Sequence, residues 1–248
     1  MKKIYAILLL ILCISCNSED ANDCFQTSGN IISETISITD FSKIEVGEDI
    51  TLVVKEGATH QVTIETGKNL LNDVEAKVVG ETLFLSDNND CNYVRDYGIT
   101  TIYVTAPNIT EIVSKTQFEV RSDGILTFPI LELISENFTN SSAASGNFNL
   151  QLQNQELQIV FNNLSNLFIS GSTEKFTISF PGGNSRVEAA NFAANRVIIS
   201  SRSSNDIIIN PQQELRGDTY GTGDVIAVNT PPIIEFTTHY TGNLIFQE

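Results

Sequence analysis

Residues 148–169 read FNLQLQNQELQIVFNNLSNLFI, and they contain the unit that repeats through the second half of the chain. Phe148 and Leu150 flank one polar residue, and the same apolar–variable–apolar pattern returns at Leu167 and Ile169. Alternation with a period of two is typical of a strand that buries one face. The stretch therefore predicts short strands that recur at a fixed interval.

The pattern continues to the end of the sequence in two interleaved series. The groups of the first series follow one another at nearly equal intervals and begin at Phe148, Leu167, Val187, Ile207, Val225 and Leu244. The groups of the second series begin at Leu131, Leu157, Phe176, Val197, Leu215 and Ile234. Their inner positions are apolar except at Gly217. Each repeat of about 19 residues thus holds two short strands and two turns, and such a unit buries its apolar face only against its neighbours.

Two all-β architectures fit these repeats. In a β-solenoid, equivalent strands stack in parallel about 4.8 Å apart, and like side chains form ladders inside. In an antiparallel sandwich, strands also recur, at intervals of roughly 8 to 12 residues. A sandwich has no reason to keep a nearly constant double period, so the sequence favours the solenoid, with rungs of about 19 residues.

The first half of the chain is less regular. Apolar alternation appears near residues 44–54, 62–64, 83–85 and 102–104, as expected of a meander or of degenerate rungs. Residues 118–120 fit a further rung, and the Ser- and Asn-rich stretch from Asn137 to Gly146 fits a surface loop inserted before Phe148. A single helical turn is expected near residues 69–75. No linker divides the chain after its leader.

The N-terminus has the features of an export signal. Lys2 and Lys3 precede an apolar run, Ile4 to Leu12, which is too short to span a bilayer. Ser15-Cys16 resembles the lipobox of bacterial lipoproteins, which implies cleavage before Cys16 and lipid attached to its sulfur; an ordinary secretory signal is the alternative. We therefore expect a signal peptide over 1–15, an acidic tether over 16–30 and a solenoid domain over 31–248. This domain would be irregular over 31–130 and regular over 131–248.

The tether predicts where the protein is located. Residues 17–23 read NSEDAND, and Ser followed by acids after a lipidated Cys resembles the surface-export signal of Bacteroidetes lipoproteins; a plain solvated linker is the alternative. We expect an outer-membrane lipoprotein that faces the cell surface or the periplasm and is held to the membrane by its N-terminal lipid. Several acyl chains on Cys16 would give stable anchoring, because each buried methylene contributes about 0.8 kcal/mol.

Charge and cysteine content narrow the function classes. The chain has 30 acidic and 14 basic residues, a net charge of -16, so it would repel a polyanion and is not expected to bind nucleic acid. Cys24 and Cys91 remain after processing at Cys16, and two cysteines in an exported chain predict one disulfide. Closing this loop would contribute about 4 kcal/mol on the chain-entropy model.

No catalytic, metal or cofactor site can be assigned from the motifs. His60 and His239 lack further ligands at metal-binding spacing. Asp87, Asp90 and Asp96 share an Asn-rich stretch in which calcium is conceivable, but a solvated loop is favoured because the spacing is not that of an EF-hand. Five tyrosines are candidates for sugar stacking: Tyr93, Tyr97, Tyr103, Tyr220 and Tyr240.

Two further patterns bear on catalysis. Gly221-Thr222-Gly223-Asp224 suggests a phosphate loop, but no helix pattern follows it, so a turn is favoured. Polysaccharide lyases and hydrolases on β-solenoids need paired carboxylates on one face. Outward residues such as Glu188 and Asp206 form no stacked acidic column in the aligned repeats.

Several segments together resemble the head GIN domain family of auto-transporter adhesins, which is common among Bacteroidetes lipoproteins. The resemblance covers nearly the whole mature chain and rests on these segments: 41–46 (FSKIEV), 50–54 (ITLVV), 83–85, 102–107 (IYVTAP), 215–217, 221–225 (GTGDV), 231–232 and 242–244. Turns such as 183–185 and 204–206 depart from the family's Gly-rich form. The resemblance implies a right-handed, helix-like all-β fold, whereas the adhesin label is itself an analogy at the level of the fold.

These observations favour a non-catalytic envelope lipoprotein, an adhesin or binding module that needs no cofactor. Its ligand would be a glycan or a protein, contacted by one solenoid face and the Asn137–Gly146 loop, although the sequence names no binding residues. Two alternatives stay open. One is a carbohydrate-active enzyme on the same scaffold, and the other is a structural component of an envelope complex.

Overall fold

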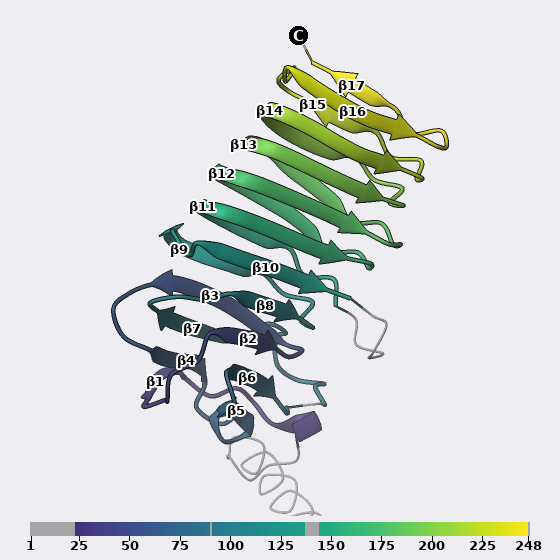
Figure 1. Cartoon of the computed structure of the whole chain (residues 1–248). Helices are drawn as coiled ribbons and strands as arrows, with labels where there is room; N and C mark the ends of the chain where they lie inside the picture. The colour runs from purple at the N-terminus through teal and green to yellow at the C-terminus, as the bar shows by residue number, and fades with distance from the viewer. Residues whose placement is uncertain (1–22, 90, 137–143, 248) are drawn as a thin grey trace, which may run out of the picture.

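The computed structural model describes residues 23–89, 91–136 and 144–247, and in this part of the chain the fold is all-β (Figure 1). A single sheet of 17 strands curls on itself, and the only helices in these residues are two 3-10 turns. The elements are η1 (Asp23–Phe25), β1 (Ile31–Ile36), β2 (Lys43–Val46), β3 (Ile50–Glu56), β4 (Gln61–Gly67), η2 (Leu71–Asp73), β5 (Val74–Val79), β6 (Thr82–Asp87), β7 (Thr100–Ala106), β8 (Glu111–Ser114), β9 (Val120–Leu126), β10 (Ile130–Ser135), β11 (Phe148–Phe161), β12 (Asn166–Phe180), β13 (Arg186–Ser201), β14 (Ile207–Thr219), β15 (Val225–Ala227), β16 (Ile233–Thr238) and β17 (Leu244–Phe246).

The C-terminal repeats pair in parallel, in the register that the two series predict. Phe148 of β11 lies opposite Leu167 of β12, and Leu167 lies opposite Val187 of β13. The first series continues through Ile207 and Val225 to Leu244, and the second pairs in the same way from Leu131 to Ile234. Parallel pairing excludes the antiparallel sandwich. We call the residues from the start of one first-series group to the start of the next a layer; the layer that begins at Phe148, for example, ends before Leu167.

The prediction of two short strands in every layer is wrong for four of the layers. β11 to β14 are continuous strands of 13 to 16 residues, each of which includes both expected groups. Two of these strands, β12 and β14, contain a glycine whose backbone conformation side-chain-bearing residues rarely adopt. Gly171 in β12 and Gly217 in β14 have φ angles of 115° and 130°, and a Cβ on Gly217 would lie 1.9 Å from the carbonyl oxygen of Ile199. This close approach explains why Gly217 interrupts the apolar pattern.

The core consists of ladders of like side chains between the two walls of the curled sheet. The ring of Phe161 stacks on Phe148 at 5.1 Å and on Phe180 of the next layer at 5.8 Å. All three rings are buried, as are the other inward positions of β11 to β14. Each apolar side chain thus packs against neighbours above, below and across, which accounts for the stability of a stack of short repeats.

Polar ladders hold the turns between the layers. Ser203 donates a hydrogen bond to the carbonyl of Ser185 at 2.6 Å, and Ser185 donates to that of Asn163 at 3.3 Å. Further along, Asp224 accepts from the backbone N–H of Asn243 at 2.8 Å. These bonds satisfy groups that the sheet leaves unpaired at each turn.

The N-terminal half is also layered, but its layers do not follow the order of the sequence. β2 pairs in parallel with both β6 and β8, and β3 pairs in parallel with both β7 and β9. The β2–β3 layer therefore lies between two layers that come later in the chain. Antiparallel strands close this end: β4 pairs with β7, β1 with β4, and β5 with β6.

The expected helical turn near residues 69–75 is present as η2, whereas η1 was not predicted. Neither turn in the described part of the chain is long or apolar enough to cross a bilayer. The signal peptide, Cys16 and the tether up to residue 22 lie outside the described residues, as do residues 137–143 of the predicted surface loop.

Candidate functional site

A loop of polar residues joins β6 to β7 at the closed, N-terminal end of the sheet. Its turn is built by the side chain of Asn92. The Oδ1 atom accepts hydrogen bonds from the backbone N–H groups of Val94 and Arg95, at 3.2 and 2.9 Å, and the Nδ2 atom donates to the carbonyl of Arg95 at 2.7 Å. An Asn that bonds to its own backbone in this way favours a compact turn over a strand.

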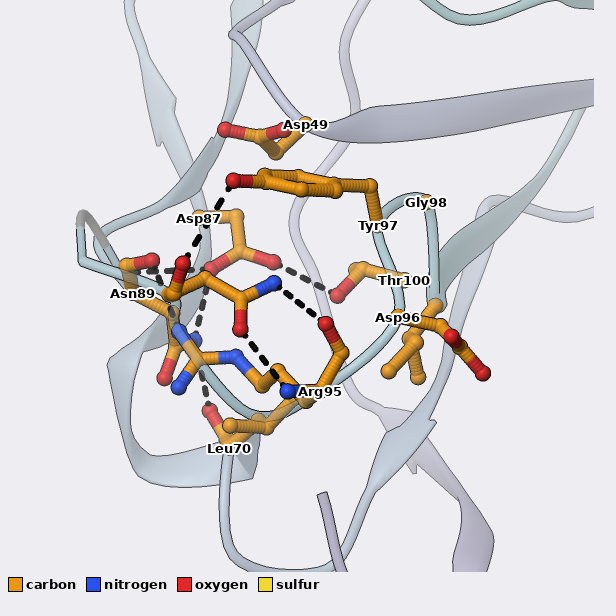
Figure 2. Close-up of a pocket in the computed structure, with 11 residues that line it drawn as sticks. Asp49, Leu70, Asp87, Asn89, Arg95, Asp96, Tyr97, Gly98 and Thr100 are labelled. Atoms are coloured by element: carbon orange, nitrogen blue, oxygen red, sulfur yellow. Dashed lines mark hydrogen bonds between the residues drawn. The ribbon is translucent and has the colours of Figure 1, made fainter. Parts of the chain in front are cut away.

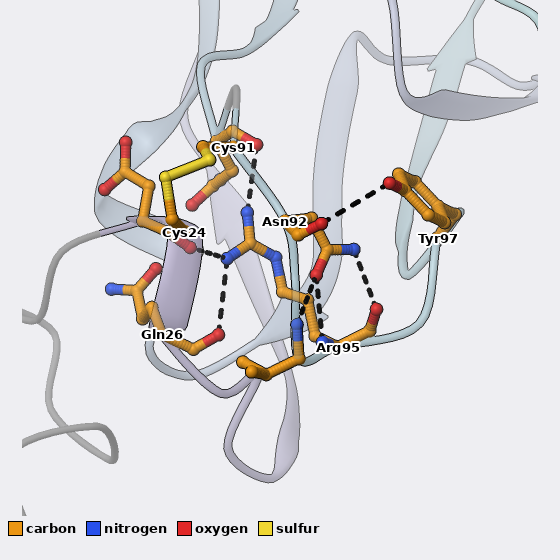
Figure 3. The surroundings of a disulfide bond; sticks show 9 residues. Cys24, Gln26, Cys91, Asn92, Arg95 and Tyr97 are labelled. Atoms are coloured by element: carbon orange, nitrogen blue, oxygen red, sulfur yellow. Dashed lines mark hydrogen bonds between the residues drawn. A yellow bond between two sulfur atoms is a disulfide. The ribbon is translucent and has the colours of Figure 1, made fainter.

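The guanidinium of Arg95 ties this loop to the start of the described chain (Figure 3). It donates to the backbone carbonyls of Asp23 at 2.6 Å, Gln26 at 3.3 Å and Asn89 at 2.9 Å. Cys24 and Cys91 are joined by a disulfide beside it. The loop is therefore cross-linked twice to η1, once covalently and once by a fork of charge-assisted hydrogen bonds.

A small pocket of about 50 Å³ opens between this loop and the neighbouring strands (Figure 2). Its polar wall includes Asp87, which accepts from Thr100 Oγ1 at 2.5 Å and from Asn89 Nδ2 at 2.6 Å. Its rim includes Asp49 and the ring of Tyr97, which is 73% exposed. The pocket thus presents carboxylate and amide groups next to an accessible aromatic face. We call this the cap pocket; its lining residues are Asp49, Leu70, Asp87, Asn89, Asn92, Arg95, Asp96, Tyr97, Gly98, Ile99 and Thr100.

Asp49 on the rim has a backbone conformation that is unusual for a side-chain-bearing residue. Its φ is 61°, the only positive value outside glycine among the described residues. Gln117 stabilises it from both sides: the amide Nε2 donates to Asp49 Oδ1 at 2.6 Å, and Oε1 accepts from the Asp49 N–H at 3.1 Å. The neighbouring layer therefore fixes the carboxylate in place.

The carboxylates of Asp23, Asp73 and Asp87 lie close enough to influence one another. Burial raises the pKa of the Asp73 carboxyl above its usual 3.8, and the nearby charges of Asp23 and Asp87 raise it further, while Arg95 opposes them.

The structure separates most of the site residues that the sequence suggested. His60 contacts Asp40 at 3.0 Å and the carbonyl of Phe41 at 2.9 Å, whereas His239 pairs with Asp218 at 2.7 Å. Of the three loop aspartates, Asp87 and Asp96 line the cap pocket, and Asp90 lies outside the described residues. No group of three or more His, Cys, Asp or Glu side chains in the described residues is arranged to hold a metal ion.

The five tyrosines do not form one surface. Tyr93 and Tyr97 share the β6–β7 loop, whereas Tyr220 and Tyr240 lie at the opposite end of the molecule. Tyr220 stacks on His239 at 4.3 Å, with Arg202 over its ring at 4.6 Å. Tyr103 on β7 bonds to Glu65 at 3.3 Å; burial, then the charge and hydrogen bond of Glu65, raise its pKa.

The other candidates have structural roles. Residues 221–224 form a turn between β14 and β15, and a Cβ on Gly221 would lie 1.9 Å from the carbonyl oxygen of Ser203. The carboxylate of Glu188 pairs with Arg186, and that of Asp206 accepts from the N–H of Asp224 at 2.9 Å. These carboxylates hold neighbouring residues in place.

Sequence reasoning grouped Asn92 with the loop aspartates but missed both its role in building the turn and Arg95. One signal was available, because Arg95 is the only basic residue in the Asn- and Asp-rich stretch 86–98, four positions after a cysteine.

Comparison with known proteins agrees with this fold. The sequence profile of the family described as "Putative auto-transporter adhesin, head GIN domain" matches residues 40–231. A search among proteins of curated function gives no match.

Solved structures of similar fold include proteins from Bacteroides and Parabacteroides species. A putative adhesin from Bacteroides fragilis NCTC 9343 is 20% identical, covers 89% of this chain and 99% of its own, and has a TM-score of 0.77. A putative lipid binding protein from Parabacteroides distasonis ATCC 8503 is 16% identical, with coverages of 89% and 98% and a TM-score of 0.65. A putative adhesin from Parabacteroides merdae ATCC 43184 is 15% identical, with the same coverages and a TM-score of 0.62. At these identities the likeness concerns the fold alone. Because the family profile matches most of its length, this chain belongs to the head GIN domain family of putative auto-transporter adhesins.

Proposed function

We propose that this protein is a non-catalytic binding module of the cell envelope, anchored by lipid on Cys16 and built as a right-handed β-solenoid with rungs of about 19 residues. Its mature chain comprises the tether over 16–30 and the domain over 31–248. The parallel register of the layers and the family membership support this proposal. So do the names of two of the similar structures, putative adhesin and putative lipid binding protein.

The observation that carries the binding function is the exposed ring of Tyr97 on the rim of the cap pocket. The disulfide, Asn92 and the Arg95 fork hold the loop in one conformation, so a ligand would not have to order it. An aromatic face beside carboxylate and amide groups suits a glycan, whose C–H groups stack on the ring and whose hydroxyls bond to the polar wall. The cap pocket is thus the contact surface that we propose, in place of the solenoid face and the 137–146 loop.

The binding test compares two exposed tyrosines at opposite ends of the molecule. The chain from Asn17 onward, which contains every described element, is applied to an array of glycans and matrix proteins. Binding to a glycan should fall at least tenfold in Tyr97→Ala and remain in Tyr240→Ala, whose ring is 67% exposed. Blank arrays would contradict the binding function, and equal losses in both variants would contradict the cap pocket as its site.

The anchoring test uses the full chain in its host. Processing with lipid on Cys16 predicts that the wild-type protein sediments with membranes and that Cys16→Ala protein does not. Protease treatment of intact cells then separates a surface-facing from a periplasm-facing domain. A Cys16→Ala protein that remains with the membrane after processing would refute lipid anchoring at this residue.

A further inference from the structure

Close to its first described residues, the chain exposes a pair of aromatic side chains. Phe25 of η1 and Tyr93 of the β6–β7 loop have ring centroids 5.7 Å apart, and the two residues are 54% and 75% exposed. Val94, the next residue of the loop, is 52% exposed. Single exposed apolar residues are ordinary, whereas several large ones together mark a contact surface. We call Phe25, Tyr93 and Val94 the aromatic patch.

The aromatic patch is held in place although none of its residues belongs to a strand. The disulfide joins Cys24, which precedes Phe25, to Cys91. Two residues after Cys91, the N–H of Tyr93 donates to the carbonyl of Cys24 at 2.9 Å. On the other side of Phe25, Gln26 is fully buried. A surface that is already ordered in this way loses little conformational entropy when it makes a contact.

The aromatic patch and the cap pocket are separate parts of the same loop. Figure 3 shows the ring of Tyr97, which stands at the rim of the cap pocket, on the far side of Asn92 from the Cys24–Cys91 disulfide. A ligand in the cap pocket therefore leaves the patch without an occupant, and the patch needs an explanation of its own.

The lipid anchor would bring this patch to a membrane, and here the inference rests on the function proposed above. Six residues, 17–22, separate a lipidated Cys16 from Asp23, where η1 begins. A fully extended chain from Cys16 to Cys24 reaches at most about 29 Å. Parallel pairing from β6 through the successive layers to β16 puts the last layer roughly 40 Å further along the stack. The patch end is thus the end that the tether keeps near the bilayer.

The charges around the patch indicate how it would contact lipid. Residues 16–31 and 86–98 together contain six acidic residues and one basic residue. The basic residue is Arg95, whose guanidinium donates to three backbone carbonyls. Contact then does not depend on attraction to anionic headgroups, which is the mode of polybasic segments. Apolar and aromatic side chains remain, and tyrosine is enriched at the membrane–water interface.

We propose that the aromatic patch docks on the surface of the lipid bilayer, with Phe25 and Val94 at the boundary of the acyl chains and the ring of Tyr93 at headgroup level. Three side chains bind a bilayer only weakly by themselves. The anchor compensates for this weakness, because linkage through a short segment gives an effective concentration on the order of millimolar. Lipid on Cys16 then provides attachment, and the patch fixes the orientation of the domain, with the cap pocket beside the membrane and β16 and β17 farther from it.

The test supplies the anchor chemically. The chain from Cys16 onward, which contains every described element, is coupled through the Cys16 thiol to phosphatidylcholine vesicles that carry a maleimide lipid. The chain has no Trp, so Tyr93→Trp places a single fluorophore in the patch. Spin-labelled lipid should quench its emission at least threefold more strongly than that of Tyr240→Trp. Tyr240 is the matched control because it is 67% exposed and lies at the opposite end of the molecule, after β16.

A second set of variants tests the contribution of the patch. In the Tyr93→Trp protein, Phe25→Ser should lower the quenching, whereas Phe168→Ser on β12, where the native ring is 41% exposed, should leave it unchanged. Val94→Ser takes the place of Phe25→Ser if that variant does not fold. Replacing part of the phosphatidylcholine by anionic phosphatidylglycerol should also weaken the quenching, and added salt should restore it, because salt screens the repulsion.

Three results would overturn the proposal: weak quenching of Tyr93→Trp, equal quenching at positions 93 and 240, or stronger quenching on the anionic vesicles. Since the vesicles themselves supply the anchor, these results do not depend on whether the host attaches lipid to Cys16. Sedimentation of the Cys16→Ala protein decides that question separately.

Discussion

Gly171 lies opposite Leu152 in the pairing of β12 with β11, so close that a Cβ on Gly171 would stand 2.0 Å from the Leu152 carbonyl oxygen. Its φ of 115° is also one that other residues rarely adopt. We expect Gly171→Ala to lower the free energy of unfolding by about 2–4 kcal/mol, because the ladder must move apart locally. Urea unfolding measures this change. Gly182→Ala, with open space at its Cβ position, is the control, and an equal effect in both would refute the explanation.

The phenylalanine ladder gives a second prediction. Phe161 is fully buried between two rings, whereas Phe168 lies on the outer wall of the next layer, 41% exposed. Phe161→Ala should cost about 3–5 kcal/mol in the free energy of unfolding, and Phe168→Ala about 1 kcal/mol or less. Thermal or urea unfolding of the two variants measures the difference. Similar losses would mean that the ladder does not form the core.

Reduction of the disulfide gives a third prediction. Cys24 and Cys91 are 67 residues apart, and releasing this loop should cost about 4 kcal/mol on the chain-entropy model. The urea midpoint of the wild type should fall when a reductant is added. A double variant, Cys24→Ser with Cys91→Ser, should unfold at the reduced midpoint in both conditions. A wild-type midpoint that is indifferent to reductant would show that the cysteines are not bonded in the protein.

The pKa of Asp73 gives a prediction with a definite sign. Because its pKa is raised in the folded state, the charged carboxylate destabilises the fold at pH values above that pKa, and protonation relieves this effect as the pH falls through it. Asp73→Asn should therefore raise the melting temperature slightly at pH 7, and the gain should shrink as the pH approaches about 4 and below. Glu48→Gln, an exposed carboxylate outside this cluster, is the control. A gain that grows on acidification would contradict the prediction.

The repeats could be predicted from the sequence because each layer buries the same positions. The period alone places Leu167 opposite Phe148, and the structure has that pair. The continuous strands were missed because apolar alternation does not distinguish a bend from a turn. Gly217 stands out in the sequence because it interrupts the apolar inner positions, but only the position of the Ile199 carbonyl reveals why glycine is required there.

The order of the N-terminal layers could not be predicted. Ile44 of β2 pairs with Leu83 on one side and Ile112 on the other, and no local pattern encodes contacts so distant in sequence. The cap pocket could not be predicted from the sequence for the same reason. Its residues come from Asp49, Leu70 and the β6–β7 loop, which the pairing of whole layers brings together.

The constancy of the register has a consequence for how such a chain can change length. Val187 pairs with Leu167 as Ile207 pairs with Val187. The layers in the middle of the molecule are therefore structurally equivalent to one another. Duplication or deletion of one whole layer would change the length of the stack by about 4.8 Å and leave the first and last layers unchanged. The number of repeats would then set the distance between the last layer, β16 and β17, and the loop that carries the Cys24–Cys91 disulfide.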